Sequence, residues 1–142
     1  MMSAEWSVSL KFTILANVGK RHCNILHVSA GGNQDKYGDR NPAIFYEKDA
    51  GWVQVQSAVN GNMFSGVNRP LILNKEYTVE IHQRYLNQGV YRYTVILDGE
   101  IIKSDNNGQA FQYHNVKVWT SGKWNEPACN GVIRDLKIVN FL

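Results

Sequence analysis

Cysteine is nearly absent from this sequence, in which Cys23 and Cys129 are the only two. They lack the Cys-x-x-Cys spacing of a zinc site, so a zinc centre of that kind is excluded. Both lie beside the ends of predicted strands. If the first and last strands pair, the two thiols can meet as a disulfide; otherwise both are partly buried free thiols. The sequence leaves these two alternatives open.

Long hydrophobic runs are also missing. No apolar stretch approaches the roughly 20 residues that cross a bilayer, so membrane insertion is not expected. The opening segment, MMSAEWSVSLKF, lacks the basic and apolar regions of a secretory signal. The chain is therefore either cytoplasmic or the mature form of a secreted protein with an added start methionine. It contains no Asn-x-Ser/Thr sequon, which excludes N-linked glycosylation in either compartment.

Runs of basic residues are short. The 15 lysines and arginines and the 12 acidic residues give a net charge of +3, and the longest basic run is Lys20-Arg21. Proteins that bind nucleic acids concentrate positive charge in a patch or groove. A small and dispersed charge favours solubility instead, so nucleic acid is not among the expected partners.

What the sequence does contain is a two-residue periodicity. In WSVSLKFTILA, the apolar residues Trp, Val, Leu, Phe and Ile alternate with Ser, Lys and Thr. The same alternation recurs in YTVEIHQRY, VYRYTVIL, VKVW and GVIRDLKIVNFL. This pattern is typical of strands that are buried on one face. In the last segment, strict alternation places Leu136 and Ile138 on the core face and Ile133 on the opposite face.

Turn-forming residues separate these strands at short intervals. Asp98-Gly99 lies between two apolar runs and predicts a two-residue type I′ hairpin, which needs positive φ at both positions. No window shows the 3.6-residue period of an amphipathic helix, and no internal repeat or linker stands out. We therefore predict one all-β domain over residues 1–142, folded as a two-sheet antiparallel β-sandwich, or jelly roll, of about 10–12 strands.

Two stretches carry a resemblance to a known superfamily. NILHVSAGGNQDKYGDRNPAIFY reads as a strand that leads through a Tyr-Gly-Asp-Arg loop into the next strand, and GVIRDLKIVNF reads as a closing strand beside the first. In this order of strands, the chain resembles laminin-G-like and concanavalin-A-like jelly-roll domains of marine-invertebrate extracellular proteins. The resemblance implies a secreted, lectin-like module. Relatives often carry cysteines in the loop, where this chain has Gln34 and Asp35, so hydrogen bonds must hold the loop here.

The loop at residues 31–42 is twelve residues long, whereas most connections need about 4–6. Its side chains are those that a lectin uses: amides, carboxylates and guanidinium groups bond to sugar hydroxyls, and an aromatic ring packs on the C–H face. Asp35 and Tyr37 are favoured as sugar contacts, and Asp39 and Arg40 as a scaffold that holds the loop. The candidate carbohydrate-binding residues of this loop are Asn33, Asp35, Tyr37, Asp39 and Arg40.

The connection TSGKWNEPACNG, residues 120–131, is the second candidate. Trp124 lies in polar surroundings, where a large indole either binds a ligand or folds back as a lid over the core. Asn125 and Glu126 add hydrogen-bonding groups of the kind that a galactoside uses. We expect this connection and the first loop to meet at one end of the sandwich and to form one carbohydrate site, with a galactoside-type glycan favoured.

Calcium is the one candidate cofactor, because laminin-G-like and concanavalin-like relatives often bind it through oxygen ligands. Asp35 and Asp39 are its candidate ligands. No Asp-x-Asp-x-Asp spacing supports them, so the sequence predicts no certain cofactor.

Catalytic motifs are missing. The sequence has no Gly-x-Ser-x-Gly elbow and no His-Glu-x-x-His pair, and its four histidines are scattered. A jelly-roll glycosidase needs two facing carboxylates, yet Glu80 has no acidic neighbour two or four positions further on. We therefore predict that the protein is not an enzyme.

The leading hypothesis is a lectin that binds glycans or glycoproteins and gains avidity as a homo-oligomer. Its expected location is extracellular, with the cytoplasm as the alternative. The alternative function is a protein–protein adhesion or assembly module of the laminin-G type, which predicts a large apolar surface patch. A cytoplasmic galectin fits the fold, but the His-x-Asn-x-Arg and Trp-x-x-Glu-x-Arg patterns expected of one are missing.

Overall fold

The computed structural model of the chain describes residues 1–19, 21–120 and 127–142. Within these ranges it contains ten β-strands and no helix, and therefore no helix that could span a bilayer. The strands are β1 (Trp6–Ile14), β2 (His22–Ser29), β3 (Ala43–Glu47), β4 (Trp52–Val59), β5 (Asn62–Pro70), β6 (Glu76–Asn87), β7 (Val90–Leu97), β8 (Glu100–Asn107), β9 (Lys117–Trp119) and β10 (Gly131–Asn140).

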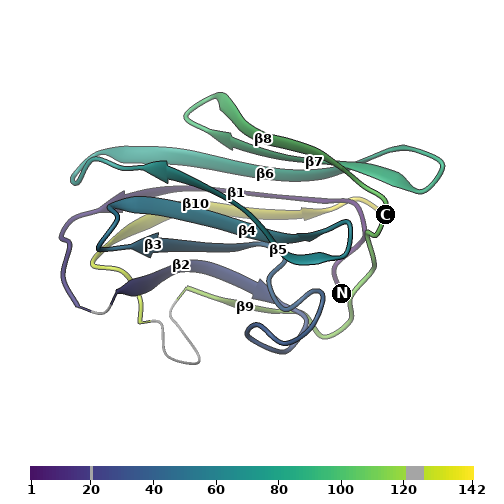
Figure 1. Cartoon of the computed structure of the whole chain (residues 1–142), viewed down its shortest axis with the longest axis horizontal. Helices are drawn as coiled ribbons and strands as arrows, with labels where there is room; N and C mark the ends of the chain where they lie inside the picture. The colour runs from purple at the N-terminus through teal and green to yellow at the C-terminus, as the bar shows by residue number, and fades with distance from the viewer. Residues whose placement is uncertain (20, 121–126) are drawn as a thin grey trace.

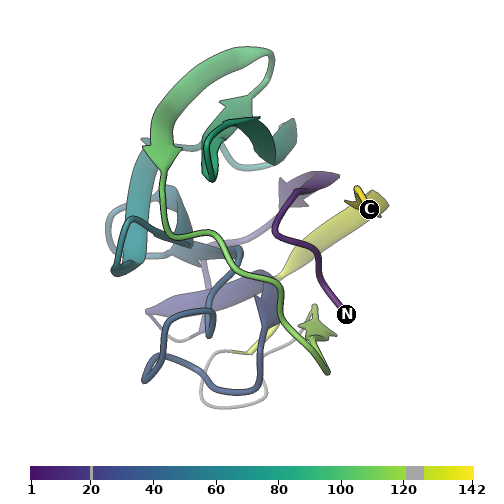
Figure 2. The same ribbon diagram turned by 90° about the vertical axis from the view of Figure 1, so that its right-hand side faces the viewer.

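The strands form two antiparallel sheets of five strands each. One sheet has the order β10-β1-β6-β7-β8 and the other has the order β5-β4-β3-β2-β9. Figure 1 shows the two layers, and Figure 2 shows them from the end where both chain termini lie. The predicted two-sheet sandwich is confirmed, and so is the predicted pairing of the first strand with the last.

The core lies between the sheets and follows the alternation of the sequence. Strand β1 runs between β10 and β6, and its burial pattern alternates along its whole length. Trp6, Leu10 and Phe12 are each no more than 1% exposed. Burying a side chain of this size contributes about 1.5–3 kcal/mol, so this strand alone supplies a large part of the stabilisation.

The last strand corrects the strict alternation predicted for it. Asp135 has a positive φ of 56°, and the register between β1 and β10 shifts at this point. The resulting β-bulge adds one residue to β10. Ile133 pairs with Phe12 and packs against the core, whereas Leu136 and Ile138, which the sequence predicts as its core residues, are 40% and 37% exposed at the edge of the sheet. The prediction that Ile133 faces away from the core was wrong, because alternation along a strand fails where a bulge intervenes.

A disulfide joins Cys23 in β2 to Cys129, two residues before β10. Of the two alternatives that the sequence left open, a disulfide or two free thiols, the structure contains the disulfide. The residues beside it also pair, through a bridge between Asn24 and Ala128. The crosslink closes a loop with a sequence separation of 106 and fastens the start of β10 to the opposite sheet.

Asn107, at the end of β8, joins the sheets at the other end of the molecule. Its side chain is fully buried and donates to the Gln83 side chain at 2.9 Å and to the backbone carbonyl of Ala58 at 3.3 Å. Its oxygen accepts the backbone N–H groups of Asn60 and Gln109. This buried amide thereby fixes the segment after β8, against which the long loop of the candidate site packs.

Candidate functional site

The polar loop between β2 and β3 is organised around one buried carboxylate. Asp39 is 3% exposed, and its two oxygens accept the backbone N–H groups of Gly32 (3.1 Å), Asp35 (2.9 Å) and Lys36 (2.8 Å). Its own carbonyl contacts the His27 ring nitrogen Nε2 at 2.7 Å. Hydrogen bonds thus hold the loop, as expected for a loop without cysteine. Asp39 has the scaffold role that the sequence favours, and its contact with a sugar stays a prediction.

Tyr37 fastens the loop to the segment after β8. Its hydroxyl donates to the carbonyl of Gln109 at 2.6 Å, and its ring meets Phe111 edge to face, with centroids 5.6 Å apart. Burial raises the pKa of Tyr37. Asp35 is exposed nearby, at a hollow of about 340 Å³ that Lys36 and Tyr113 also line. Burial likewise raises the pKa of Tyr113 to about 12.

Arg40 leaves this loop and lies along the outer face of the β5-β4-β3-β2-β9 sheet. Its Nε donates to the carbonyl of Asn33 at 3.0 Å, and its Nη1 donates to the side-chain oxygen of Gln56 at 2.6 Å. The guanidinium also lies over the rings of Phe45 and Phe64, at 4.9 and 5.2 Å from their centroids. These contacts fix a cation and its planar donors on the face of the sheet rather than at the tip of the loop.

A polar hollow of about 290 Å³ opens beside Arg40. Gln54 and Gln56 of β4 both reach it, because alternate residues of a strand point to the same side. Phe45 is 3% exposed and forms an apolar part of its wall. Among the described residues, no carboxylate lines it. We call this site the glutamine hollow, and its lining is His22, Gln34, Arg40, Phe45, Gln54 and Gln56.

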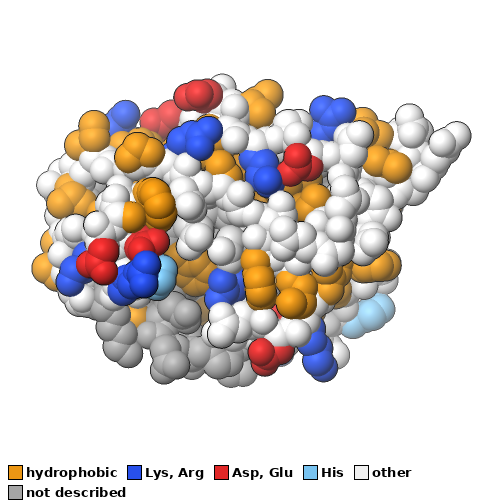
Figure 3. Space-filling view, in the orientation of Figure 1, with side chains coloured by type: hydrophobic (Ala, Val, Ile, Leu, Met, Phe, Trp, Pro, Cys, Tyr) orange, Lys and Arg blue, Asp and Glu red, His pale blue; other side chains and the backbone are white. Residues whose placement is uncertain are grey.

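A charged cluster lies at the end of the glutamine hollow where His22 stands. Glu47 accepts from Arg21 at 2.8 Å and from the indole N–H of Trp52 at 3.0 Å, and it lies 3.8 Å from the ring of His22. The hydrogen bond from Arg21 holds the pKa of Glu47 below its usual value. Figure 3 shows acidic, basic and histidine side chains gathered at the left end of this view. Arg21 balances the negative charge of Glu47, and the hydrogen bond from Trp52 to Glu47 holds the half-buried indole beside the glutamines.

Sequence reasoning identified Arg40 and its neighbour Asn33 but missed the strand residues around them. His22, Gln54, Gln56 and Trp52 were not among the candidates. A signal was present in the sequence, since Trp-x-Gln-x-Gln in β4 sets three binding-type side chains on one face of a strand that is otherwise apolar. The sequence favours the loops instead, because polar residues are more conspicuous in a connection than on the face of a sheet.

The second candidate group, Trp124, Asn125 and Glu126, lies outside the described residues. The residues that flank it pair with β2: Trp119 lies opposite His27, and Ala128 lies opposite Asn24. The 31–42 loop follows Ser29, the last residue of β2. The expected meeting of the two loops therefore stays a prediction.

The fit of a calcium ion to Asp35 and Asp39 is limited by the hydrogen bonds of the loop. An ion at Asp39 would compete with three backbone N–H groups for two oxygens. The described part of the chain also has no group of three or more His, Cys, Asp or Glu side chains that could hold a metal. Calcium dependence stays a prediction that ligand-binding experiments with and without EDTA can test.

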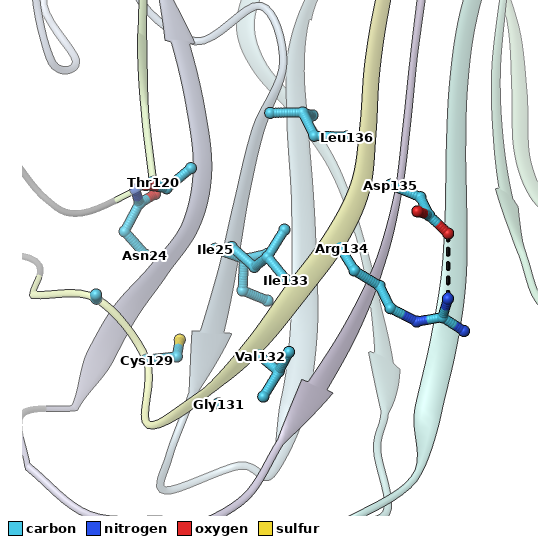
Figure 4. A pocket seen from close by; sticks show the side chains of 11 residues that line it. Asn24, Ile25, Thr120, Cys129, Gly131, Val132, Ile133, Arg134, Asp135 and Leu136 are labelled. Atoms are coloured by element: carbon cyan, nitrogen blue, oxygen red, sulfur yellow. Dashed lines mark hydrogen bonds and ion pairs between the residues drawn. The ribbon is translucent and has the colours of Figure 1, made fainter.

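A further hollow has a different chemistry. It measures about 520 Å³ and lies between β10 and β2 (Figure 4). Ile25, Ile133 and Leu136 point into it, whereas Arg134 and Asp135 point away. This hollow shares no lining residue with the glutamine hollow, and its lining suits apolar groups more than sugar hydroxyls.

Comparisons with known proteins show the fold. No family model matches the chain, and no curated protein matches its sequence. Among solved structures, a candidate carbohydrate-binding protein of Bacteroides ovatus matches with a TM-score of 0.64 at 12% identity, over 97% of this chain and 38% of that one. A heptameric SAP-like pentraxin of Limulus polyphemus matches with a TM-score of 0.60 at 14% identity, over 96% of this chain and 64% of that one.

Sheep galectin-11, solved with glycerol, matches with a TM-score of 0.51 at 14% identity, over 97% of this chain and 92% of the galectin. Alginate lyases also match. The chain spans less than two thirds of the length of the first two structures. At such low identity these likenesses show a shared fold, and we conclude that the chain has the jelly-roll β-sandwich architecture found in carbohydrate-binding proteins, pentraxins and galectins.

Proposed function

We propose that the protein is a carbohydrate-binding lectin whose site is the glutamine hollow. The observation that carries the proposal is the set of hydrogen-bonding side chains on the outer face of the sheet around Arg40. Glutamine amides both donate and accept, which matches the paired donor and acceptor character of sugar hydroxyls. Trp52, half-buried on the same face, supplies an aromatic surface for the apolar side of a sugar ring.

The preorganisation of Arg40 supports this proposal. Its guanidinium is already bonded to Asn33 and Gln56 and packed on two aromatic rings. A side chain that is fixed before binding loses less conformational freedom when a ligand arrives. The shared fold is consistent with sugar binding, and the galactoside preference, the laminin-G-like relationship and the homo-oligomer are finer parts of the same proposal.

A glycan array with the folded protein tests the proposal, with calcium present and with EDTA. We expect a defined set of glycans to bind, and Gln54→Ala to weaken the best of them about tenfold because one bidentate partner is lost. Gln112→Ala is the matched control: it removes the same group from an exposed position outside the hollow. The proposal fails if no glycan binds above background, or if both variants weaken binding equally.

We propose binding without catalysis, although lyases share the fold. The described lining of the hollow contains no pair of carboxylates for glycoside hydrolysis. Glu47, the acidic side chain beside it, is held by Arg21 and Trp52. Incubation of the purified protein with the glycans that it binds should give no new product by mass spectrometry.

We also propose an extracellular location, which the disulfide between Cys23 and Cys129 supports because such crosslinks persist in oxidising compartments.

The alternative function, protein–protein adhesion, is favoured by one observation. Val132, Leu136 and Ile138 are 37–52% exposed along the open edge at β10. Leu136→Ser separates the two functions, because it should leave glycan binding unchanged and abolish capture of a protein partner.

A further inference from the structure

The outer face of the other sheet carries a compact polar patch on three adjacent strands. The register aligns two cross-strand rows, because β6 pairs with β7 and β7 pairs with β8. Their side chains point outward, since the pair between them, Gln83 and Tyr93, is buried in the core. We call this surface the arginine patch, and its rows are His82-Thr94-Ser104 and Arg84-Arg92-Asn106.

Two arginines lie directly opposite each other in this patch. Arg84 and Arg92 are cross-strand partners, and like charges in that arrangement repel. Arg84 is anchored toward β1: it donates to Glu5 at 2.8 Å, and its guanidinium lies 3.7 Å from the ring centroid of Phe141. Separate anchors on the two sides keep both cations on the face despite their repulsion.

Arg92 is anchored on the β8 side by neutral groups. Its Nε donates to the Asn106 side chain at 2.9 Å, and its Nη1 donates to the Ser104 hydroxyl at 3.4 Å. Within the described ranges, no carboxylate lies within ion-pair distance of Arg92. The acidic groups facing the patch are Glu5, which pairs with Arg84, and Glu80, which lies 3.5 Å from His82. Arg92 therefore has only neutral hydrogen-bond partners, whereas Arg84 is balanced by Glu5.

The geometry points to a binding site for one oxyanion group, and we propose that its ligand is a sulfated or carboxylated unit of an acidic polysaccharide. Guanidinium groups bind such oxyanions through paired, charge-assisted hydrogen bonds. The hydroxyls of Thr94 and Ser104 and the Asn106 amide surround the cations with groups that suit neutral sugar hydroxyls. The patch spans two strand spacings, about 10 Å, which matches a short stretch of sugar rather than a long polyanion track.

This site is independent of the glutamine hollow, because the two occupy the outer faces of different sheets. Their joint presence would allow one molecule to hold a sugar on one side and an acidic polymer on the other. The failure of one proposal leaves the other intact, and the variants below separate them.

Binding to immobilised dextran sulfate at low salt tests the proposal, with unsulfated dextran as the reference polymer. We expect Arg92→Gln to lower the affinity at least about fivefold, because the variant loses the charge and the fork of donors. Lys137→Gln removes the same charge from the same face at β10, outside the patch, and should lower affinity less than about twofold. Gln54→Ala should leave the affinity unchanged.

Three results would overturn the proposal. They are no binding of the native protein to dextran sulfate, equal loss in Arg92→Gln and Lys137→Gln, and equal binding to unsulfated dextran. Inorganic sulfate distinguishes a polymer site from a free-anion site. If millimolar sulfate displaces the native protein completely at constant ionic strength, the site recognises the free anion and the polysaccharide assignment is wrong.

Discussion

The Asp39 carboxylate holds the 31–42 loop together, because it accepts the backbone N–H groups of Gly32, Asp35 and Lys36. We expect Asp39→Ala to lower the free energy of unfolding by roughly 2–3 kcal/mol, since three amides lose a charged acceptor. Asp39→Asn keeps one acceptor oxygen and should cost less. Urea denaturation of both variants measures the effect, and an Asp39→Ala protein as stable as the native one would contradict this account of the loop.

Glu47 gives the protein a defined response to acid. Because Arg21 lowers its pKa in the folded state, its contribution to stability is present above the pKa of the unfolded state. That contribution is lost as the pH falls through the lower, folded value. We expect the NMR titration of the Glu47 carboxyl to have its midpoint below 4.5 and to move upward in Arg21→Gln. An unchanged midpoint in the variant would show that Arg21 is not the cause.

At this scale the sequence predicts residue types better than residue roles. Asn33, Tyr37 and Arg40 are all tied into contacts of the long loop. The rotation of Arg40 onto the sheet could not be foreseen, because it depends on Gln56 and two phenylalanines from other strands. Local sequence does not show which strands will be neighbours.

At the scale of elements, the bulge in β10 decides which of its residues are buried. Deletion of Asp135 would remove the extra residue and turn Ile133 away from the core. We expect a loss of at least about 2 kcal/mol in unfolding free energy, because a one-residue slip exchanges the two faces of a strand. Asp135→Gly is the control, since glycine accepts the positive φ and keeps the bulge. Equal stability of the deletion and the control would show that the bulge has no such role.

The strands themselves follow from the sequence. Alternation identified β1, β6, β7 and β10, and the Asp98-Gly99 turn has positive φ at both residues, as a type I′ hairpin requires. The bulge at Asp135 was not predicted, although Arg134 and Asp135 are two successive polar residues that interrupt the alternation between Ile133 and Leu136. It arises from the pairing of β10 with β1, which only the folded structure contains.

For the molecule as a whole, the disulfide is the longest-range covalent constraint. It closes a loop with a sequence separation of 106, so in the chain-entropy description its loss costs about 4–5 kcal/mol. We expect the Cys23→Ser, Cys129→Ser double variant to unfold at a clearly lower urea concentration, with an unchanged near-UV spectrum at low urea. A double variant with the native midpoint would show that noncovalent contacts alone determine the stability.

The overall architecture could be read from the sequence, whereas the proposed binding face could not. The two-residue period and the spacing of turns are properties of the chain, and they predict two packed sheets. Which outer face carries ligand-binding chemistry depends on strand order, since Gln34, Gln54 and His22 meet only because β2, β3 and β4 are neighbours. Strand order is set by the fold as a whole and leaves no local mark.

Both chain ends lie at the same end of the sandwich, and Asn140 donates from its side chain to the carbonyl of Met1 at 3.0 Å (Figure 1). The two terminal segments are also joined at Ser3, whose hydroxyl donates to the carbonyl of Phe141 at 2.8 Å. A few glycines could therefore connect the last residue to the first. A permutant opened at the β6–β7 hairpin would therefore keep every strand pairing. Because the two ends are adjacent, the jelly roll can also be inserted into a host protein through two neighbouring linkers, and both outer faces stay accessible.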